Sequence, residues 1–384
     1  MPLNPRVLSL SKSATLKITA LTKKLIREGK DVVNFAAGEP DFDTPDFIKQ
    51  EAIKAINHGF TKYTPSAGVP ALREAIAQKL NLENKIPLKP EGVIVTSGAK
   101  YAVYVALSTL LEDNQEVIIP SPYWVSYPEM VKLAGAKASY LAADEKDNFK
   151  INPLHLEKAI NHKTKILILN YPSNPTGITY TYEDLKAISA IVKKRRIYVI
   201  SDEIYEALLY DGLKHYSFAA LPDMFERTIT INGFSKAFSM TGWRLGYLAG
   251  PEEIINQASK MIDHTTSCAC AISQKAAVAA FKYSDWVEES RRIFQKRRDL
   301  LFNGLSACPK ITPFKSQGTF YMFCDIRKTG LNSFDFASKL LENHLVSCVP
   351  ADAFGIDGFI RLSFSTSEEQ ITKGIERIKN FFQE

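Results

Sequence analysis

Apolar residues in the first quarter of the chain recur at the three- and four-residue spacing of an amphipathic helix. One such stretch follows Thr44-Pro45 and stops at Gly59, and a second follows Pro70 and continues to Leu80. Proline in the first turn and glycine just past the last turn are typical helix boundaries. The pattern therefore predicts two helices in this part of the chain.

A different pattern begins near residue 93, where short apolar runs rich in β-branched residues alternate with helical stretches. The runs are Val93–Val95, Glu116–Ile119, Lys165–Leu169, Ile197–Ile200 and Thr228–Ile231. Strands that recur between helices are typical of an α/β fold with a mostly parallel, doubly wound sheet. Ligands of such sheets bind beyond the carboxyl ends of the strands, so the residues that follow each run are the candidates for chemistry.

The pattern changes again after about residue 284. A long helical stretch rich in arginine is followed by apolar runs at Gly318–Phe323 and Phe359–Phe364, with helical patterns between and after them. This order favours a second, smaller α+β unit that the N-terminal segment completes. We expect residues 1–45 to join the small domain, residues 46–285 to form a large domain, and residues 286–384 to form the small C-terminal domain.

Composition narrows the classes of function. The chain has 384 residues, of which 45% are hydrophobic and 23% are charged, so it can build more than one core. Its 48 Lys and Arg outnumber its 42 Asp and Glu by six, which at this length is no signature of nucleic-acid binding. No apolar run reaches the roughly 18 residues of a membrane span. We expect neither nucleic acid nor membrane as a partner.

Cysteine and histidine usage favours a reducing compartment and gives no support to a metal centre. The five cysteines lie in the last third of the chain without a C-x-x-C pair, and the six histidines show no i, i+3 or i, i+4 pair. Prolines interrupt the N-terminal residues before any apolar stretch of signal-peptide length. We expect a soluble cytoplasmic protein with no bound metal.

Two of the strand ends carry turns that suit a ligand. The turn after the first run reads Thr-Ser-Gly-Ala-Lys from Thr96 to Lys100 and opens a helical stretch, whose free N–H groups and dipole suit a phosphate. An ordinary βα turn explains the same residues. The loop after the third run holds Asn174 before Pro175, either to donate a hydrogen bond to a ligand or simply to form a turn.

The last two strand ends add a carboxylate and a lysine. Asp202 follows a buried run, where a carboxylate is costly to desolvate unless it meets a cation; a structural ion pair is the alternative. Lys236 stands in an aromatic segment with no acidic residue nearby in sequence, and a desolvated lysine near another cation loses its proton readily, as a Schiff-base amine requires. A phosphate turn, a carboxylate for a pyridinium nitrogen and a sheltered lysine for an aldehyde are the features that a pyridoxal phosphate site needs.

Seven motifs then occur in an order typical of one family. They are Ala36-Ala-Gly38-Glu-Pro-Asp-Phe-Asp43, Lys62-Tyr63-Thr64, Ser121-Pro-Tyr-Trp124-Val-Ser-Tyr127, Asn174-Pro-Thr-Gly177, Ser201-Asp-Glu-Ile-Tyr205, Ser235-Lys236 and Gly242-Trp-Arg244. With these motifs the sequence resembles the class I aminotransferases of PLP fold type I, and within them the bacterial-type beta subgroup of aspartate aminotransferases. The resemblance runs from about Ser13 to Arg361. It implies pyridoxal 5′-phosphate as the cofactor of the large domain.

The resemblance also implies a role for each matching residue. Lys236 would form the Schiff base with the cofactor and act as the catalytic base, and Asp202 would pair with the pyridine nitrogen. Tyr205 and Asn174 would hold the phenolic oxygen of the ring, while Trp124 would stack on its face. The remaining cofactor contacts would be Ser97, Ala99, Lys100, Ser235, Arg244 and, reaching from the other subunit of a homodimer, Tyr63.

Substrate contacts follow in the same way. Arg361 would grip the α-carboxylate beside the Gly38 backbone, since an arginine fork suits a carboxylate. In this subgroup a lysine at the position of Lys100, with Ser13 and Thr15, is associated with the distal carboxylate of aspartate and glutamate. Trp124 and Asn174 would also line the substrate. The implied reaction is ping-pong transamination of L-aspartate with 2-oxoglutarate to oxaloacetate and L-glutamate.

Other functions stay open at this point. Relatives that also accept prephenate tend to carry a basic residue and proline before the Ser-x-Thr stretch, where this chain has Ser11-Lys12. A transaminase of prephenate or of aromatic amino acids is one alternative, and a PLP-dependent C–S β-lyase of the same fold is another. A nucleic-acid-binding module would use the basic runs at 193–196 and 291–298, but these lack interleaved aromatic residues and fit a solvated helix face better.

Overall fold

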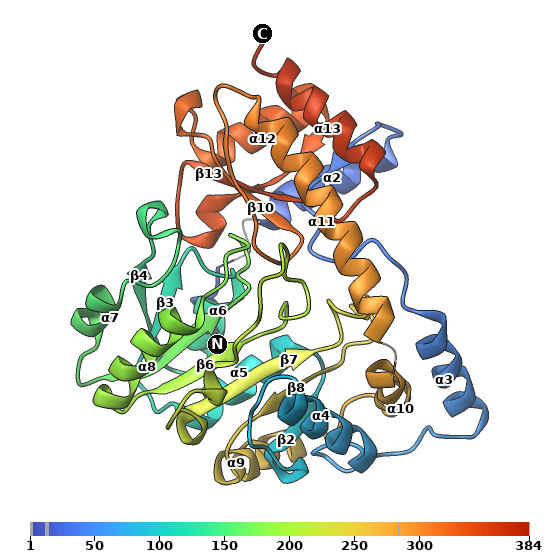
Figure 1. The fold of residues 1–384 in the computed structure, drawn as a ribbon, viewed down its shortest axis with the longest axis vertical. Coiled ribbons are helices and arrows are strands. Elements are labelled where there is room, and N and C mark those ends of the chain that lie inside the picture. The colour runs from blue at the N-terminus through green and yellow to red at the C-terminus, as the bar shows by residue number, and fades with distance from the viewer. Residues whose placement is uncertain (1–2, 12–14, 283, 384) are drawn as a thin grey trace.

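The computed structural model describes residues 3–11, 15–282 and 284–383, and its centre is a seven-stranded sheet (Figure 1). The spatial order is β2-β8-β7-β6-β5-β3-β4, and β8 alone runs antiparallel to its neighbours. The α/β class and the mostly parallel sheet are confirmed. The strands are β2 (Val93–Thr96), β3 (Glu116–Ser121), β4 (Lys137–Ala142), β5 (Thr164–Asn170), β6 (Tyr198–Asp202), β7 (Thr228–Gly233) and β8 (Gly246–Ala249).

Each of the five runs expected as strands overlaps one of these strands, with Ile197 lying just before β6, but β4 and β8 were not expected. β4 is an edge strand with mostly exposed or half-buried residues, so its sequence carries no apolar run. β8 is four residues long and begins at Gly246, which faces the backbone of Ala99 so closely that a Cβ would lie 2.3 Å from the Ala99 nitrogen. Glycine is therefore required where a strand pattern would favour a β-branched residue.

Helices cover both faces of the sheet. One face carries α5 (Ala99–Leu110), α6 (Ser126–Leu133) and α9 (Glu252–Asp263), and the other carries α7 (Pro153–Ala159) and α8 (Tyr182–Arg195). The helices α3 (Asp46–Asn57), α4 (Pro70–Leu82) and α10 (Ala271–Ala277) pack around β2 and β8. The two early helices expected from periodicity are therefore present, as α3 and α4.

A second group of elements lies above the large sheet in Figure 1. Its antiparallel sheet has the order β12-β13-β10-β9, and β1 pairs in parallel with β11. The strands are β1 (Val33–Asn34), β9 (Thr312–Phe314), β10 (Tyr321–Asp325), β11 (Val346–Ser347), β12 (Val349–Pro350) and β13 (Phe359–Ser363). Its helices are α2 (Thr15–Arg27), α11 (Ser284–Ser306), α12 (Ser333–His344) and α13 (Glu368–Asn380). The short helix α1 (Pro5–Leu8) does not belong to this group and contacts α6 beside the large sheet.

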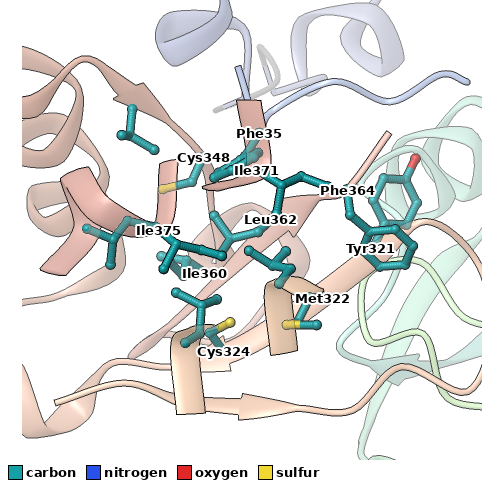
Figure 2. Close-up of a cluster of buried hydrophobic side chains, with 14 of the residues drawn as sticks. Phe35, Tyr321, Met322, Cys324, Cys348, Ile360, Leu362, Phe364, Ile371 and Ile375 are labelled. Atoms are coloured by element: carbon teal, nitrogen blue, oxygen red, sulfur yellow. The ribbon is translucent and has the colours of Figure 1, made fainter. Parts of the chain in front are cut away.

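Side chains from both chain ends build the core of this second group (Figure 2). Phe35 of the N-terminal segment packs in one cluster with Ile360 of β13 and Ile375 of α13. The strand expected over 318–323 begins later, at Tyr321, because Thr319 has φ +64° and so cannot lie in an extended strand. The division of the chain at residues 45 and 285 stays a prediction.

The described helices include none that is both long and apolar enough to span a lipid bilayer.

Candidate active site

A cavity of about 480 Å³ lies where the carboxyl ends of several parallel strands meet. Asn170 ends β5, Asp202 ends β6, and Lys236 follows β7; all three line the cavity. Arg361 of β13 and Gly38 of the N-terminal segment also line it. The cavity therefore lies at the edge of the sheet that the strand order predicted, and the second group of elements contributes part of its wall.

The Lys236 amine faces into this cavity. Its Nζ donates a hydrogen bond of 2.6 Å to the Gly38 carbonyl oxygen, and it lies 5.8 Å from the centre of the Tyr205 ring. Burial, together with the positive charge of Arg361, lowers the pKa of Lys236 to about 8. A substantial fraction of this amine is therefore neutral near physiological pH, which a nucleophile or a general base requires.

Asp202 is a buried carboxylate without a cation of its own. Its side chain accepts a hydrogen bond of 2.6 Å from the Tyr127 hydroxyl at Oδ2 and one of 3.3 Å from the Ile204 amide at Oδ1. The residue is 4% exposed, and in the described part of the chain no lysine or arginine forms an ion pair with it. Burial raises the pKa of Asp202 to about 6. A cationic ligand group in the cavity would supply the missing partner.

The turn before α5 is shaped for an anion. Gly98 caps this helix with φ +90°, and a Cβ on Gly98 would lie 2.6 Å from Nη2 of Arg244. The Arg244 guanidinium thus lies against the helix N-terminus while its Nη1 donates to the Thr241 carbonyl oxygen at 2.9 Å. Burial and the charge of Arg244 lower the pKa of Lys100. Two cations and free backbone N–H groups gather where a phosphate group could bind.

Arg361 also lines the cavity and is 6% exposed. Its Nη1 donates to Asn174 Oδ1 at 2.9 Å, and its Nη2 donates to the Ala36 carbonyl oxygen at 3.3 Å. Its Nε is buried with no hydrogen-bond partner, and no carboxylate among the described residues forms an ion pair with this guanidinium. A buried guanidinium that lacks an anion is a site for a carboxylate ligand.

Aromatic side chains complete the walls. Trp124 lines the cavity with its ring edge-on to Tyr127, and Lys100 Nζ lies 5.0 Å from the centre of the Trp124 ring. The hydroxyls of Tyr205 and Tyr321 lie 3.0 Å apart, both inside the protein. A flat aromatic ligand would find both a stacking surface and hydroxyl partners here.

Most of the residues expected at the site are brought together. Those that line the cavity are Gly38, Ala99, Lys100, Trp124, Asn174, Asp202, Tyr205, Ser235, Lys236, Arg244 and Arg361. Ser97 precedes the cap of α5 but does not line the cavity, and Tyr63 lies on the surface with 88% of its area exposed. Ser13 lies outside the described residues. Thr15 begins α2, but its side chain lies outside the described part of the structure.

Several lining residues were given no role from the sequence. Tyr127 stands inside a motif already noted, and its position shortly after a strand end was the available signal. Tyr321, Phe354 and Thr241 also line the cavity. Nothing in the local pattern separates Tyr321 from the other apolar residues of its run, because only the packing of the two sheets shows that its hydroxyl reaches Tyr205.

A second cluster of charged groups follows β6 but has its own partners. One ligand atom from each of Glu203, Glu206 and His215 lies within 4.8 Å of the others. Glu206 forms an ion pair with Lys79 and accepts a hydrogen bond of 2.5 Å from Asn84, while a Glu203 oxygen lies 2.8 Å from His215 Nε2. Glu206 thus has a cation within the protein, and Glu203 also accepts hydrogen bonds from the Ser201 and Ser217 hydroxyls, so the cluster serves the fold.

Comparison with known proteins decides the family. Residues 30–378 match the family described as aminotransferase class I and II. The chain belongs to the class I and II aminotransferases. It is 45% identical to an aspartate aminotransferase of Geobacillus stearothermophilus, over 100% of this chain and 99% of that protein. It is 42% identical to a probable aspartate/prephenate aminotransferase of Aquifex aeolicus, over 99% of this chain and 98% of that protein.

A solved structure agrees with this assignment. The aspartate aminotransferase of Thermus thermophilus with maleate superposes with a TM-score of 0.95 at 40% identity, and the match covers 99% of each chain. The fold is therefore PLP fold type I, as the sequence resemblance implied.

Pyridoxal 5′-phosphate is the cofactor of this family, and three features of the cavity fit it. Asp202 lacks a cation, which the protonated pyridine nitrogen would provide. Only glycine fits at position 98, because a Cβ there would collide with Arg244. The guanidinium therefore lies close to the N-terminus of α5, where the two together suit a phosphate. Lys236 is held in the same cavity with a pKa low enough to react with an aldehyde.

Proposed function

We propose that this aminotransferase transfers the amino group of L-aspartate to 2-oxoglutarate, giving oxaloacetate and L-glutamate in two half-reactions. The observation that carries the proposal is a cavity in which Lys236, with a pKa of about 8, faces a buried arginine that has no carboxylate partner among the described residues. The names of the relatives from Geobacillus, Aquifex and Thermus support the choice of aspartate.

The chain's own groups divide the work of the reaction. Bound pyridoxal phosphate supplies an aldehyde for the amino group and an electron-withdrawing ring for the electron pair that Cα releases when it loses its proton. Lys236 removes that proton and, in the reverse direction, returns a proton to Cα of the product amino acid. The Gly38 carbonyl oxygen, 2.6 Å from Nζ, holds the amine at the cavity wall. Asp202 would keep the pyridine nitrogen protonated.

Other residues bind and orient. Tyr205 and Asn174 would hold the phenolic oxygen of the cofactor, and Trp124 would stack on its ring. Arg244 with the backbone of Ala99 and Lys100, and with Ser97 and Ser235, would bind the phosphate. Arg361 would bind the α-carboxylate through its two Nη groups, beside the Gly38 backbone. Anchoring that carboxylate holds the Cα–H bond toward Lys236, which favours proton removal over loss of CO₂.

Dicarboxylic substrates are favoured by the charge of the cavity. Lys100 lines it together with Arg244 and Arg361, so a second carboxylate of the substrate would meet a cation. Ser13 and Thr15 would contribute to the same end of the substrate. Prephenate is the second candidate, because the Aquifex relative is named a probable aspartate/prephenate aminotransferase.

We also propose that the protein acts in the cytoplasm as a homodimer. The family resemblance supports this, since it implies that Tyr63 contacts the phosphate in the other subunit, and the side chain is 88% exposed and so free to contact a second copy. The small domain would consist of residues 286–384 with residues 1–45, and residues 46–285 would form the large domain that binds the cofactor.

One spectroscopic experiment tests the proposed function. The purified protein, loaded with pyridoxal phosphate, is expected to be yellow, and L-aspartate should bleach the visible band while oxaloacetate forms. Lys236→Ala should bind the cofactor without a borohydride-reducible bond and should not respond to aspartate. If another amino acid bleaches the band and aspartate does not, the proposed substrate is wrong. If cystathionine releases pyruvate faster than aspartate gives oxaloacetate, the protein is a lyase.

A further inference from the structure

Tyr321 is a buried polar side chain of the cavity to which the proposed chemistry gives no task. Its ring lies at the margin of the hydrophobic cluster of the second group of elements, and its hydroxyl points away from the other labelled side chains (Figure 2). The hydroxyl lies 3.0 Å from the hydroxyl of Tyr205. The centre of the same ring lies 4.0 Å from the guanidinium carbon of Arg361, which sits over its face. Tyr321 thus touches two anchors of the site at once.

The hydrogen bond between the two tyrosines has a direction once a ligand is present. Burial raises the pKa of both phenols, so each carries a single proton at physiological pH. A ligand oxygen that only accepts takes the proton of Tyr205. The lone pair of Tyr205 is then free, and the Tyr321 hydroxyl must donate to it. Such a chain strengthens the terminal donor, because each bond polarises the next.

The contact with Arg361 is of a different kind. A guanidinium over an aromatic face is attracted by the electron-rich ring, and this stacking restricts rotation of the planar guanidinium group. The ring of Phe354 lies on the same guanidinium at 5.3 Å. These aromatic contacts fix the orientation of Arg361 without neutralising it, so the charge stays available to a carboxylate.

We propose that Tyr321 is a positioning residue that serves both anchors: its hydroxyl makes Tyr205 the donor to the phenolic oxygen of the cofactor, and its ring orients Arg361 for the substrate carboxylate. This inference rests on the proposed function, since it takes the cofactor oxygen and the carboxylate as the two ligands. It assigns the two tasks to separate parts of one side chain, which allows them to be tested separately.

The hydroxyl is tested with Tyr321→Phe in the holoenzyme. The visible absorption band of the holoenzyme changes with pH, and its pKa reports protonation of the Schiff-base nitrogen that joins Lys236 to the cofactor. A strong donor to the phenolic oxygen favours the deprotonated form. Loss of the Tyr321 hydroxyl weakens that donor, so the spectral pKa should rise by roughly half a pH unit to one pH unit.

A double-mutant cycle shows whether Tyr321 acts through Tyr205. Tyr205→Phe should raise the spectral pKa further than Tyr321→Phe, and the double variant should match Tyr205→Phe alone, because the second hydroxyl has lost its target. Tyr210→Phe is the matched control. Tyr210 is equally buried in the same cluster, but its hydroxyl donates to the Thr319 carbonyl oxygen, so the spectral pKa should not move.

The ring is tested with maleate as the probe. Tyr321→Phe keeps the ring and should leave the dissociation constant of maleate within about twofold of the original value. Tyr321→Leu removes the ring and should weaken maleate binding about fivefold. An unchanged spectral pKa in Tyr321→Phe, or additive shifts in the double variant, would overturn the role of the hydroxyl. Equal maleate binding by the Phe and Leu variants would overturn the role of the ring. A wild-type protein that forms no yellow complex would instead refute the proposed function.

Discussion

Arg298 and Arg361 are both buried against a tyrosine ring, yet they differ in what faces their charge. Arg298 is fully buried, 4.9 Å from the Tyr210 ring, and forms ion pairs with Asp211 and Asp299 at 2.8 Å. Arg361 has a side-chain amide and a backbone carbonyl as acceptors, an unpartnered Nε, and no carboxylate partner among the described residues.

The difference separates stability from function. A buried charge is costly unless an opposite charge compensates it, and Arg298 finds that compensation inside the chain. Arg361 is held by polar and aromatic contacts that leave its charge unmet, so the compensation has to come from a ligand. Two buried carboxylates differ in the same way. Asp202 in the cavity has a hydrogen bond from Tyr127 but no ion pair within the described part of the chain, whereas the nearby Glu206 forms an ion pair with Lys79. Unmatched buried charges mark the site, and matched ones support the fold.

The largest expected effect follows from removing the unmatched charge. Arg361→Met should lower kcat/KM for aspartate by roughly 10²- to 10³-fold, because the substrate carboxylate loses its charged partner. The urea midpoint of the cofactor-free variant should stay the same or rise, since an uncompensated charge has left the interior. Both quantities are measured on one preparation. If Arg361→Met loses stability and keeps its kcat/KM, Arg361 supports the fold and does not bind the substrate.

Removing the matched charge should have the opposite consequence. Arg298→Met is expected to lower the free energy of unfolding by about 2 kcal/mol, because packing and two ion pairs are lost while both aspartates stay partly solvated. Urea denaturation followed by circular dichroism measures this change. At a temperature where the variant is folded, its KM for aspartate should equal that of the original protein; a KM several-fold higher would mean that Arg298 reaches the site.

A smaller effect concerns the pH dependence of Lys236. Only its neutral form attacks the aldehyde, so the rate at which cofactor-free protein captures pyridoxal phosphate should rise about tenfold per pH unit up to about pH 8 and level off above it. Arg361→Met removes a positive charge that lowers this pKa, so the midpoint should move upward by roughly half a pH unit. Arg298→Met should leave the midpoint in place. Stopped-flow absorbance across pH 6.5–9.5 measures both midpoints.

Much of the fold was accessible from pattern alone. The five strand runs and the helices α3, α4 and α5 were predicted because periodicity and capping are local properties of the chain. The strands β4 and β8 were missed because one is a solvated edge and the other needs glycine where α5 approaches. The start of β10 was wrong by three residues, since the left-handed backbone at Thr319 leaves no clear mark in the sequence.

The site divides in the same way. Asp202 and Lys236 could be found because they lie at or shortly after the ends of buried strands, and the family resemblance added Arg361 and Trp124. Tyr127 and Tyr321 received no role, because a tyrosine in an apolar run is equally consistent with a core residue.

The sequence by itself determined which strand ends carry the reactive groups: a turn for an anion after β2, a carboxylate at the end of β6 and a lysine after β7. It also determined the family, and with it the cofactor. Tertiary structure alone decided which charges remain unmatched, because ion pairs such as that of Arg298 and Asp211 join residues 87 positions apart. It also placed Tyr321 between Tyr205 and Arg361. Local pattern records what each segment prefers, whereas the compensation of a buried charge depends on which segments meet.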